Sequence, residues 1–120
     1  MLKVVTCPVE TTLSLIGGKW KVLIIKALAP GCRRYGELRS LLGDISAKVL
    51  TEQLNEMIED HLVRKTIYAE IPPRTEYQLT EIGLSLLSIL TAMRLWGEEF
   101  KAKLERDEIE EFREPLKVNQ

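Results

Sequence analysis

The sequence predicts a mainly α-helical fold that carries one small β-hairpin. Apolar residues recur every three or four positions in four short segments before residue 61 and in one long segment after residue 80. Between these segments the period changes to two, and β-branched and aromatic residues become frequent. The 120 residues, 45% hydrophobic and 29% charged, are enough for one domain with its own core.

Two helices are predicted at the start of the chain. The first begins near Cys7-Pro8 and stops at Gly17-Gly18, and its apolar face carries Val9, Leu13 and Ile16. The second runs over residues 19–29, where Pro30-Gly31 ends it. Its expected core face consists of Trp20, Leu23, Ile24, Ala27 and Leu28.

A third and a fourth helix follow, separated by a turn at Gly43-Asp44. The third is expected over residues 35–42, after Arg33-Arg34, with Leu38, Leu41 and Leu42 pointing inward. The fourth runs over residues 46–60, with Ser46 as its N-cap. Its apolar stripe is Leu50, Leu54, Met57 and Ile58, so that the opposite face carries Lys48, Glu52, Asn55 and Glu59, with Thr51 at the margin.

The hairpin and a long final helix complete the pattern. Residues 63–71 and 75–79 are predicted strands, joined across Pro72-Pro73-Arg74. Thr80 is expected to cap one helix that continues to about residue 104. Two helices with a tight connection, followed by a hairpin, indicate a winged helix-turn-helix. We therefore expect a single domain over residues 1–104 and a charged tail over residues 105–120.

The last helix has a wider apolar face than one small domain can cover. This face carries Ile82, Leu84, Leu86, Leu87, Ile89, Leu90, Met93, Leu95, Trp96, Phe100 and Leu104. Left exposed on a monomer, such a patch would promote aggregation. We therefore expect a two-fold homodimer in which the first and last helices form the interface.

The charge distribution leaves room for a nucleic-acid partner although the net charge is only −1. Residues 1–75 carry 11 basic and 8 acidic side chains, whereas residues 76–120 carry 6 and 10. No apolar run is long enough to span a membrane and no signal peptide is recognisable, so we expect a cytoplasmic protein. The two cysteines and the single histidine fit neither a disulfide framework nor a zinc site, and no catalytic constellation is present, so we expect no cofactor, no metal and no enzyme activity.

Five segments of the chain are similar to one family of regulators. They are Cys7-Pro8-Val9-Glu10, Leu15-Ile16-Gly17-Gly18-Lys19-Trp20, Arg34-Tyr35-Gly36-Glu37-Leu38, Ile45-Ser46-Ala47-Lys48-Val49-Leu50-Thr51 and Pro72-Pro73-Arg74-Thr75-Glu76-Tyr77-Gln78-Leu79-Thr80. Together they resemble the HxlR-type winged helix-turn-helix transcriptional regulators, relatives of the MarR-type repressors. The resemblance implies a homodimeric repressor or activator that binds double-stranded DNA. Ala47 and Asn55 depart from residues common in that family, which leaves the operator sequence open.

The fourth helix is the candidate recognition helix, because the major groove admits one helix and residues near its N-terminus reach base edges first. Its candidate base-contacting residues are Ser46, Lys48, Thr51 and Asn55. The alternative is a merely solvated helix face. The wing, residues 64–79, would place Arg74 at its tip on the minor groove or the DNA backbone, the alternative being an ordinary exposed arginine.

Further cations are candidates for phosphate contacts, although each could equally be plain surface. They are Lys19, Lys21, Arg33, Arg34, Arg39 and Lys65, of which Arg34 is favoured because it precedes the helix that would cross the backbone. Cys7 lies at the start of the first helix, where the helix dipole favours a thiolate. Some relatives implied by the resemblance sense oxidants or electrophiles with a cysteine here, and the alternative is a structural thiol. The rival to a DNA-binding regulator is a winged-helix module that binds other proteins.

Overall fold

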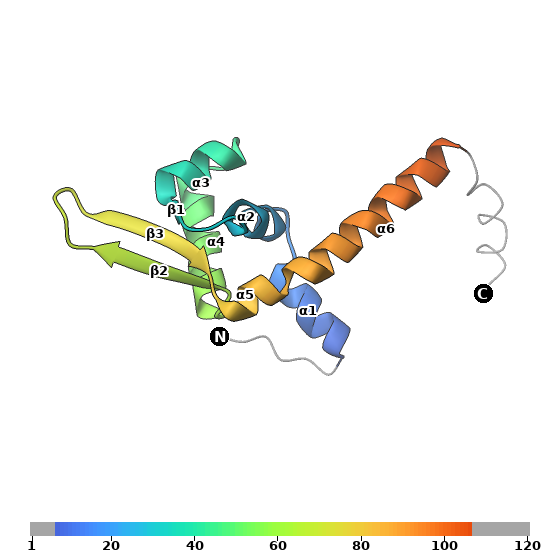
Figure 1. Cartoon of the computed structure of the whole chain (residues 1–120), viewed down its shortest axis with the longest axis horizontal. Helices are drawn as coiled ribbons and strands as arrows, with labels where there is room; N and C mark the ends of the chain where they lie inside the picture. Colours follow the sequence, from blue (N-terminus) through green and yellow to red (C-terminus); the bar gives the residue numbers. More distant parts are fainter. Residues whose placement is uncertain (1–6, 107–120) are drawn as a thin grey trace. The chain divides into compact units, whose positions relative to one another are not determined.

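The computed structural model describes residues 7–106, which fall into two compact units divided between Leu87 and Ser88. The first unit contains α1 (Pro8–Ile16), α2 (Trp20–Leu28), β1 (Arg33–Arg34), α3 (Tyr35–Leu42), α4 (Ala47–Glu59), β2 (Val63–Tyr68), β3 (Arg74–Leu79) and α5 (Glu81–Ser85) (Figure 1). Nearly all of the second unit's described part belongs to α6 (Leu87–Glu105). The predicted mainly helical fold with a hairpin wing is confirmed. None of the helices in residues 7–106 is both long enough and apolar enough to cross a membrane.

The sheet has three antiparallel strands in the order β1-β3-β2. β2 and β3 form the predicted hairpin, from Val63 opposite Leu79 to Tyr68 opposite Arg74. The predicted strand limits were wrong at the loop, because β2 ends at Tyr68 rather than at residue 71 and β3 already begins at Arg74. β1 was not predicted, since two residues are too short to show an alternating pattern.

The core of the first unit lies between α2, α3, α4 and the sheet. Its fully buried side chains are Ile24, Ile25, Leu28, Leu38, Leu50, Leu54, Met57 and Leu62. The predicted inward faces were wrong in two places, because Leu23 and Leu41 are 37% and 55% exposed. The buried face of α2 instead includes Ile25 and Lys21. Lys21 is accommodated there because its ammonium lies 2.5 Å from Oε1 of Glu56 on α4.

The end of α4 is defined by hydrogen bonds beyond its last turn. The N–H of His61 donates to the carbonyl of Ile58 at 3.0 Å, and the N–H of Leu62 donates to that of Met57 at 2.9 Å. This is the Schellman arrangement, in which the residue after the cap takes a left-handed conformation. His61 has that conformation, with φ of 65°. The expected end of the helix near residue 60 is therefore confirmed.

The single helix expected after Thr80 is interrupted. Thr80 caps α5 as predicted, since its hydroxyl accepts a hydrogen bond from the N–H of Gly83. However, α5 ends at Ser85 and α6 begins at Leu87. The hydroxyl of Ser85 donates to the carbonyl of Ile82 at 2.6 Å, and such side-chain bonds compete with the helical pattern. Of the expected tail, residues 107–120 lie outside the described part of the chain.

Candidate nucleic-acid interface

The first two turns of α4 present polar side chains away from the core. Ser46 caps the helix, and its hydroxyl accepts a hydrogen bond from the N–H of Val49 at 3.1 Å. Lys48, Thr51 and Asn55 are all exposed, as predicted from the helical period. The candidate base-contacting residues therefore share the exposed side of one well-capped helix.

Tyr35, the first residue of α3, ties α3 to the start of α4. Its hydroxyl donates to the carbonyl of Ala47 at 3.0 Å, and the same oxygen lies 3.1 Å from Oγ1 of Thr51. On its other side the Tyr35 ring lies 6.5 Å from the ring of Tyr77. The pKa of Tyr77 is raised, mainly by burial and further by Tyr35. Sequence reasoning missed this role of Tyr35, because a tyrosine at the start of a helix gives no signal of a partner sixteen residues later.

Acidic side chains limit where α4 could approach an anionic partner. Glu52 is exposed beyond the first turn, and Glu56 follows one turn later. Because Glu56 pairs with Lys21, whose side chain is only 6% exposed, Lys21 is a structural residue and its interpretation as a phosphate contact was wrong. Any contact with phosphates is expected to concentrate near the N-terminal end of α4.

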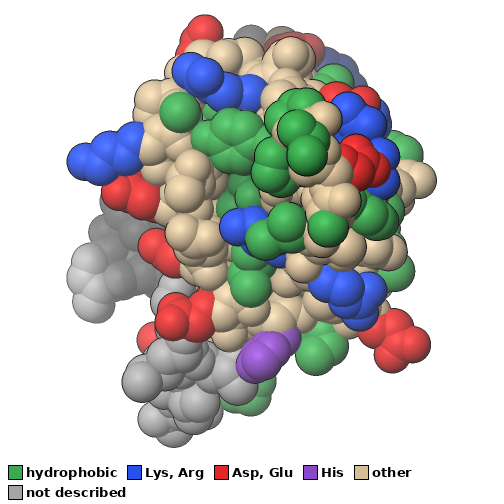
Figure 2. Space-filling view, turned by 90° about the vertical axis from the view of Figure 1, so that its left-hand side faces the viewer, with side chains coloured by type: hydrophobic (Ala, Val, Ile, Leu, Met, Phe, Trp, Pro, Cys, Tyr) green, Lys and Arg blue, Asp and Glu red, His purple; other side chains and the backbone are tan. Residues whose placement is uncertain are grey.

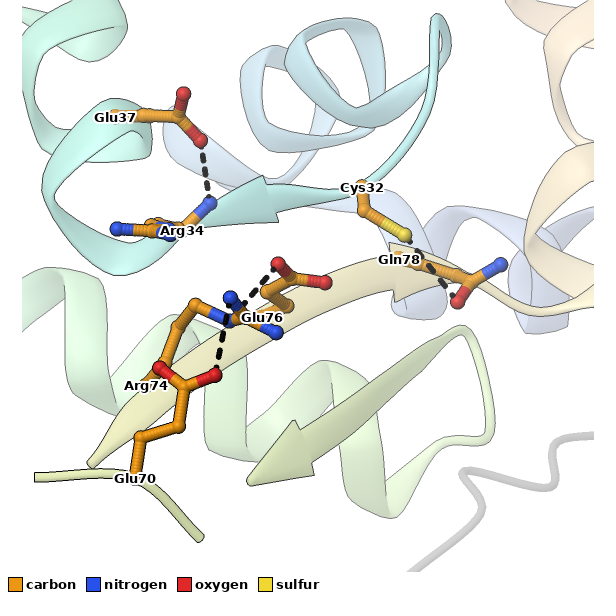
Figure 3. Close-up of polar contacts among 7 residues, drawn as sticks. All are labelled: Cys32, Arg34, Glu37, Glu70, Arg74, Glu76 and Gln78. Atoms are coloured by element: carbon orange, nitrogen blue, oxygen red, sulfur yellow. Dashed lines mark hydrogen bonds and ion pairs between the residues drawn. The ribbon is translucent and has the colours of Figure 1, made fainter. Parts of the chain in front are cut away.

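Arg74 does not lie at the tip of the wing as predicted, because it is the first residue of β3. Its guanidinium is held between two carboxylates (Figure 3). Nη1 lies 3.2 Å from Oε2 of Glu70 in the loop, and Nε lies 3.4 Å from Oε2 of Glu76 on the same strand. The guanidinium also lies over the ring of Tyr68, 4.1 Å from its centroid.

The remaining candidate cations differ in their availability. Those that are exposed are Lys19, Arg34, Arg39 and Lys65. Arg33 is half-buried, and its Nε donates to the carbonyl of Ala27 at 3.0 Å. On the face drawn in Figure 2, the Lys and Arg side chains of the described residues are interspersed with apolar and acidic ones rather than gathered in one patch. A partner that approached this face would therefore meet separate cations rather than a continuous basic surface.

Both cysteines are free and exposed. Cys7 occupies the N-cap position of α1, and its carbonyl accepts the N–H of Thr11 at 3.0 Å. Cys32 precedes β1, and its Sγ lies 3.5 Å from Oε1 of Gln78 (Figure 3). Within residues 7–106, no group of three His, Cys, Asp or Glu side chains could hold a metal ion.

Comparison with known proteins gives one consistent result. Residues 15–105 match the model of the HxlR-like helix-turn-helix family. The chain is 41% identical over 100 residues to YdeP of Bacillus subtilis, described as an HTH-type transcriptional regulator, and the match covers 83% of this chain and 78% of YdeP.

Two similar solved structures are of regulators in a stated redox form, one oxidised and one reduced. The redox regulator HypR in its oxidised form has a TM-score of 0.72 and 42% identity, covering 78% of this chain and 96% of HypR. The reduced form of the transcriptional regulator YodB from B. subtilis has a TM-score of 0.73 and 34% identity, covering 80% and 95%. With these matches and the winged helix-turn-helix architecture, the chain belongs to the HxlR-like helix-turn-helix family of transcriptional regulators.

Proposed function

We propose that this regulator is a homodimer that binds an inverted-repeat operator in double-stranded DNA, as a repressor or an activator. In this proposal α4 enters the major groove, and the wing over residues 64–79 lies on the minor groove or the backbone. The observation that carries the proposal is the exposed polar side of the first two turns of α4, held in place by the Ser46 cap and by Tyr35. A helix of this kind, fixed by the preceding helix, matches the way helix-turn-helix proteins read base edges.

Two side chains are the main candidates for base recognition. The ammonium of Lys48 suits the acceptors of guanine, and the amide of Asn55 suits the paired donor and acceptor of adenine. Ser46 and Thr51 also belong to the proposed interface, but their hydroxyls already take part in the cap and in the contact with Tyr35. They are therefore better suited to positioning the helix and contacting the backbone.

Phosphate contacts would provide the sequence-independent part of the affinity. The exposed cations Lys19, Arg34, Arg39 and Lys65 are the proposed contacts. Such contacts release counterions, so binding should weaken steeply as the salt concentration rises. As a DNA-binding protein, the regulator would act in the cytoplasm.

The proposed dimer rests on the apolar side chains that α1 and α6 each leave exposed. On α6, Trp96 and Phe100 stack with their centroids 5.3 Å apart, yet Trp96 is 66% exposed. On α1, Val9 and Leu13 are 65% and 51% exposed. A two-fold partner would bury both sets in one self-complementary interface. Two recognition helices would then face successive major grooves about 34–36 Å apart.

We further propose that Cys7 makes the operator affinity sensitive to an oxidant or an electrophile. The proposal is supported by the exposure of this thiol at the N-cap of α1 and by the similarity to the redox regulator HypR. Because α1 belongs to the proposed dimer interface, modification of Cys7 would act on the spacing of the two recognition helices rather than on base contacts.

Selection from random duplex DNA, followed by hydroxyl-radical footprinting, tests the proposed DNA binding. We expect an inverted repeat with half-sites centred about 10–10.5 base pairs, or a multiple of that distance, apart. Recovery of unrelated sequences, with no protected repeat, would favour the rival interpretation of a protein-binding winged helix.

A further inference from the structure

The wing loop has an unfavourable charge for a segment that meets DNA. Residues 69–73, which connect β2 and β3, include Glu70 and contain no Lys or Arg. The cation that adjoins the loop is Arg74, and its guanidinium is neutralised by Glu70 and Glu76 (Figure 3). In the free protein the tip of the wing therefore carries no unpaired positive charge of its own, and a phosphate would meet a carboxylate there first.

The two carboxylates hold Arg74 unequally. Glu76 belongs to β3 and has a side chain only 23% exposed, whereas Glu70 lies in the loop and is 49% exposed. The Nε of Arg74, 3.4 Å from Glu76, is buried and has no hydrogen-bond partner among the described residues. Because Glu70 belongs to the loop and not to β3, its carboxylate can leave Arg74 without displacing the strand. The Tyr68 ring would still cover one face of the guanidinium.

A hollow lies beside this ion pair. It has a volume of about 400 Å³ and lies between the wing and the start of α3. Its lining includes Arg34, Tyr35 and Gly36 on one side and the segment from Glu70 to Thr75 on the other. Arg34 is exposed, and its backbone N–H is already used by Glu37 at 2.7 Å. Arg34 and Arg74 thus line one open recess, and the acidic residue among its lining residues is Glu70, which is paired with Arg74.

We propose that this recess takes a phosphate of the DNA backbone, and that the carboxylate of Glu70 occupies its place on Arg74 while the protein is free. On binding, the phosphate replaces Glu70 at Nη1 of Arg74 and is also bound by Arg34, while Glu76 remains paired with Nε of Arg74. Guanidinium groups bind carboxylates and phosphates in the same planar manner, so the exchange keeps the guanidinium satisfied in both states. The inference rests on the proposed function and adds to it a self-occupied phosphate site in the wing.

The test uses Glu70→Gln and a duplex of arbitrary sequence, because a backbone phosphate carries no base information. Removing the competing charge is expected to tighten binding about two- to fivefold, the range of an exposed ion pair. Because Arg74 binds the same phosphate in both proteins, the slope of log affinity against log salt should stay close to that of the wild type. The matched control is Glu81→Gln, which changes the net charge equally at an exposed position on α5.

The same two substitutions, made in a protein that lacks the Arg74 guanidinium, distinguish the proposed exchange from a general effect of net charge. In a protein that carries Arg74→Met, the additional change Glu70→Gln should give no more gain than Glu81→Gln gives. If the wild type binds DNA, and Glu70→Gln and Glu81→Gln raise its affinity equally, this inference is overturned and the proposed function stays intact. Absence of DNA binding by every folded variant and by the wild type would overturn the proposed function and this inference together. Thermal unfolding of each variant establishes that it is folded.

Discussion

The hydroxyl oxygen of Tyr35 lies 3.1 Å from the hydroxyl oxygen of Thr51, so that the first residue of α3 touches the second turn of α4. The same tyrosine hydroxyl donates to the carbonyl of Ala47, the first residue of α4. One side chain thereby fixes both the start and the rotation of the proposed recognition helix. We therefore expect the orientation of Lys48 and Asn55 to depend on this contact.

Replacing Tyr35 with phenylalanine removes both contacts and retains the ring. We expect Tyr35→Phe to lower the free energy of unfolding by about 0.5–1.5 kcal/mol, the net value of a hydrogen bond. Affinity for the operator should fall by more than affinity for random DNA, because only base contacts depend on the orientation of α4. Urea unfolding and binding titrations measure the two effects. Equal losses for both DNAs would show that Tyr35 contributes stability alone.

Gly83 is expected to be intolerant of a side chain. A Cβ at this position would lie 2.2 Å from the carbonyl oxygen of Leu62, in the turn that follows α4. Because a backbone atom cannot move aside cheaply, Gly83→Ala should destabilise the protein by about 1–3 kcal/mol or more. The control is Gly97→Ala, where no atom lies within 4 Å of the added Cβ and the helix should gain about 0.5–1 kcal/mol. A change of the same sign in the free energy of unfolding of both variants, measured with urea, would contradict the close packing of Gly83 against Leu62.

The proposed dimer makes a prediction for Trp96. A glutamate placed among the exposed apolar residues of α6 should prevent their burial against a second copy. We expect Trp96→Glu to be a folded monomer at micromolar concentration in light scattering, with weakened operator binding. Thr91→Glu is the control, since Thr91 is also exposed on α6 but lies roughly 140° around the helix from Trp96. A dimeric Trp96→Glu protein would place the interface elsewhere.

The proposed role of Cys7 is tested with the second cysteine as its control. An oxidant such as diamide should lower the operator affinity of the wild type, and Cys7→Ser should bind DNA normally without responding. Cys32→Ser should retain the response, because Cys32 adjoins β1 and contacts Gln78 rather than α1. Equal sensitivity of Cys7→Ser and wild type would leave Cys7 as a structural residue.

The sequence predicted those helices that begin at a recognisable capping residue. Ser46 and Thr80 are caps, and both helices begin directly after them. Lys48 and Asn55 are exposed because the period of α4 places them opposite Leu50. In these places local chemistry and the final fold agree.

Other features depend on contacts between distant residues. Lys21 is buried only because Glu56, 35 residues later, supplies a carboxylate. Arg74 is paired rather than free because the hairpin turns earlier than the β-branched pattern suggests and brings Glu70 beside it. The break at Leu86 is hidden because the apolar spacing continues through it. A single sequence contains no local signal for any of these three.

The central claim is that α4 reads bases, and the ratio of affinities for the selected operator and for random duplex DNA tests it most directly. Lys48→Ala and Asn55→Ala should each lower that ratio by the equivalent of about 1–3 kcal/mol per lost base contact. Neither should lower the free energy of unfolding appreciably, since both side chains are exposed. Lys101→Ala, which removes an exposed charge from α6, should leave the ratio unchanged. An unchanged ratio in both α4 variants would contradict the assignment of α4 as the recognition helix.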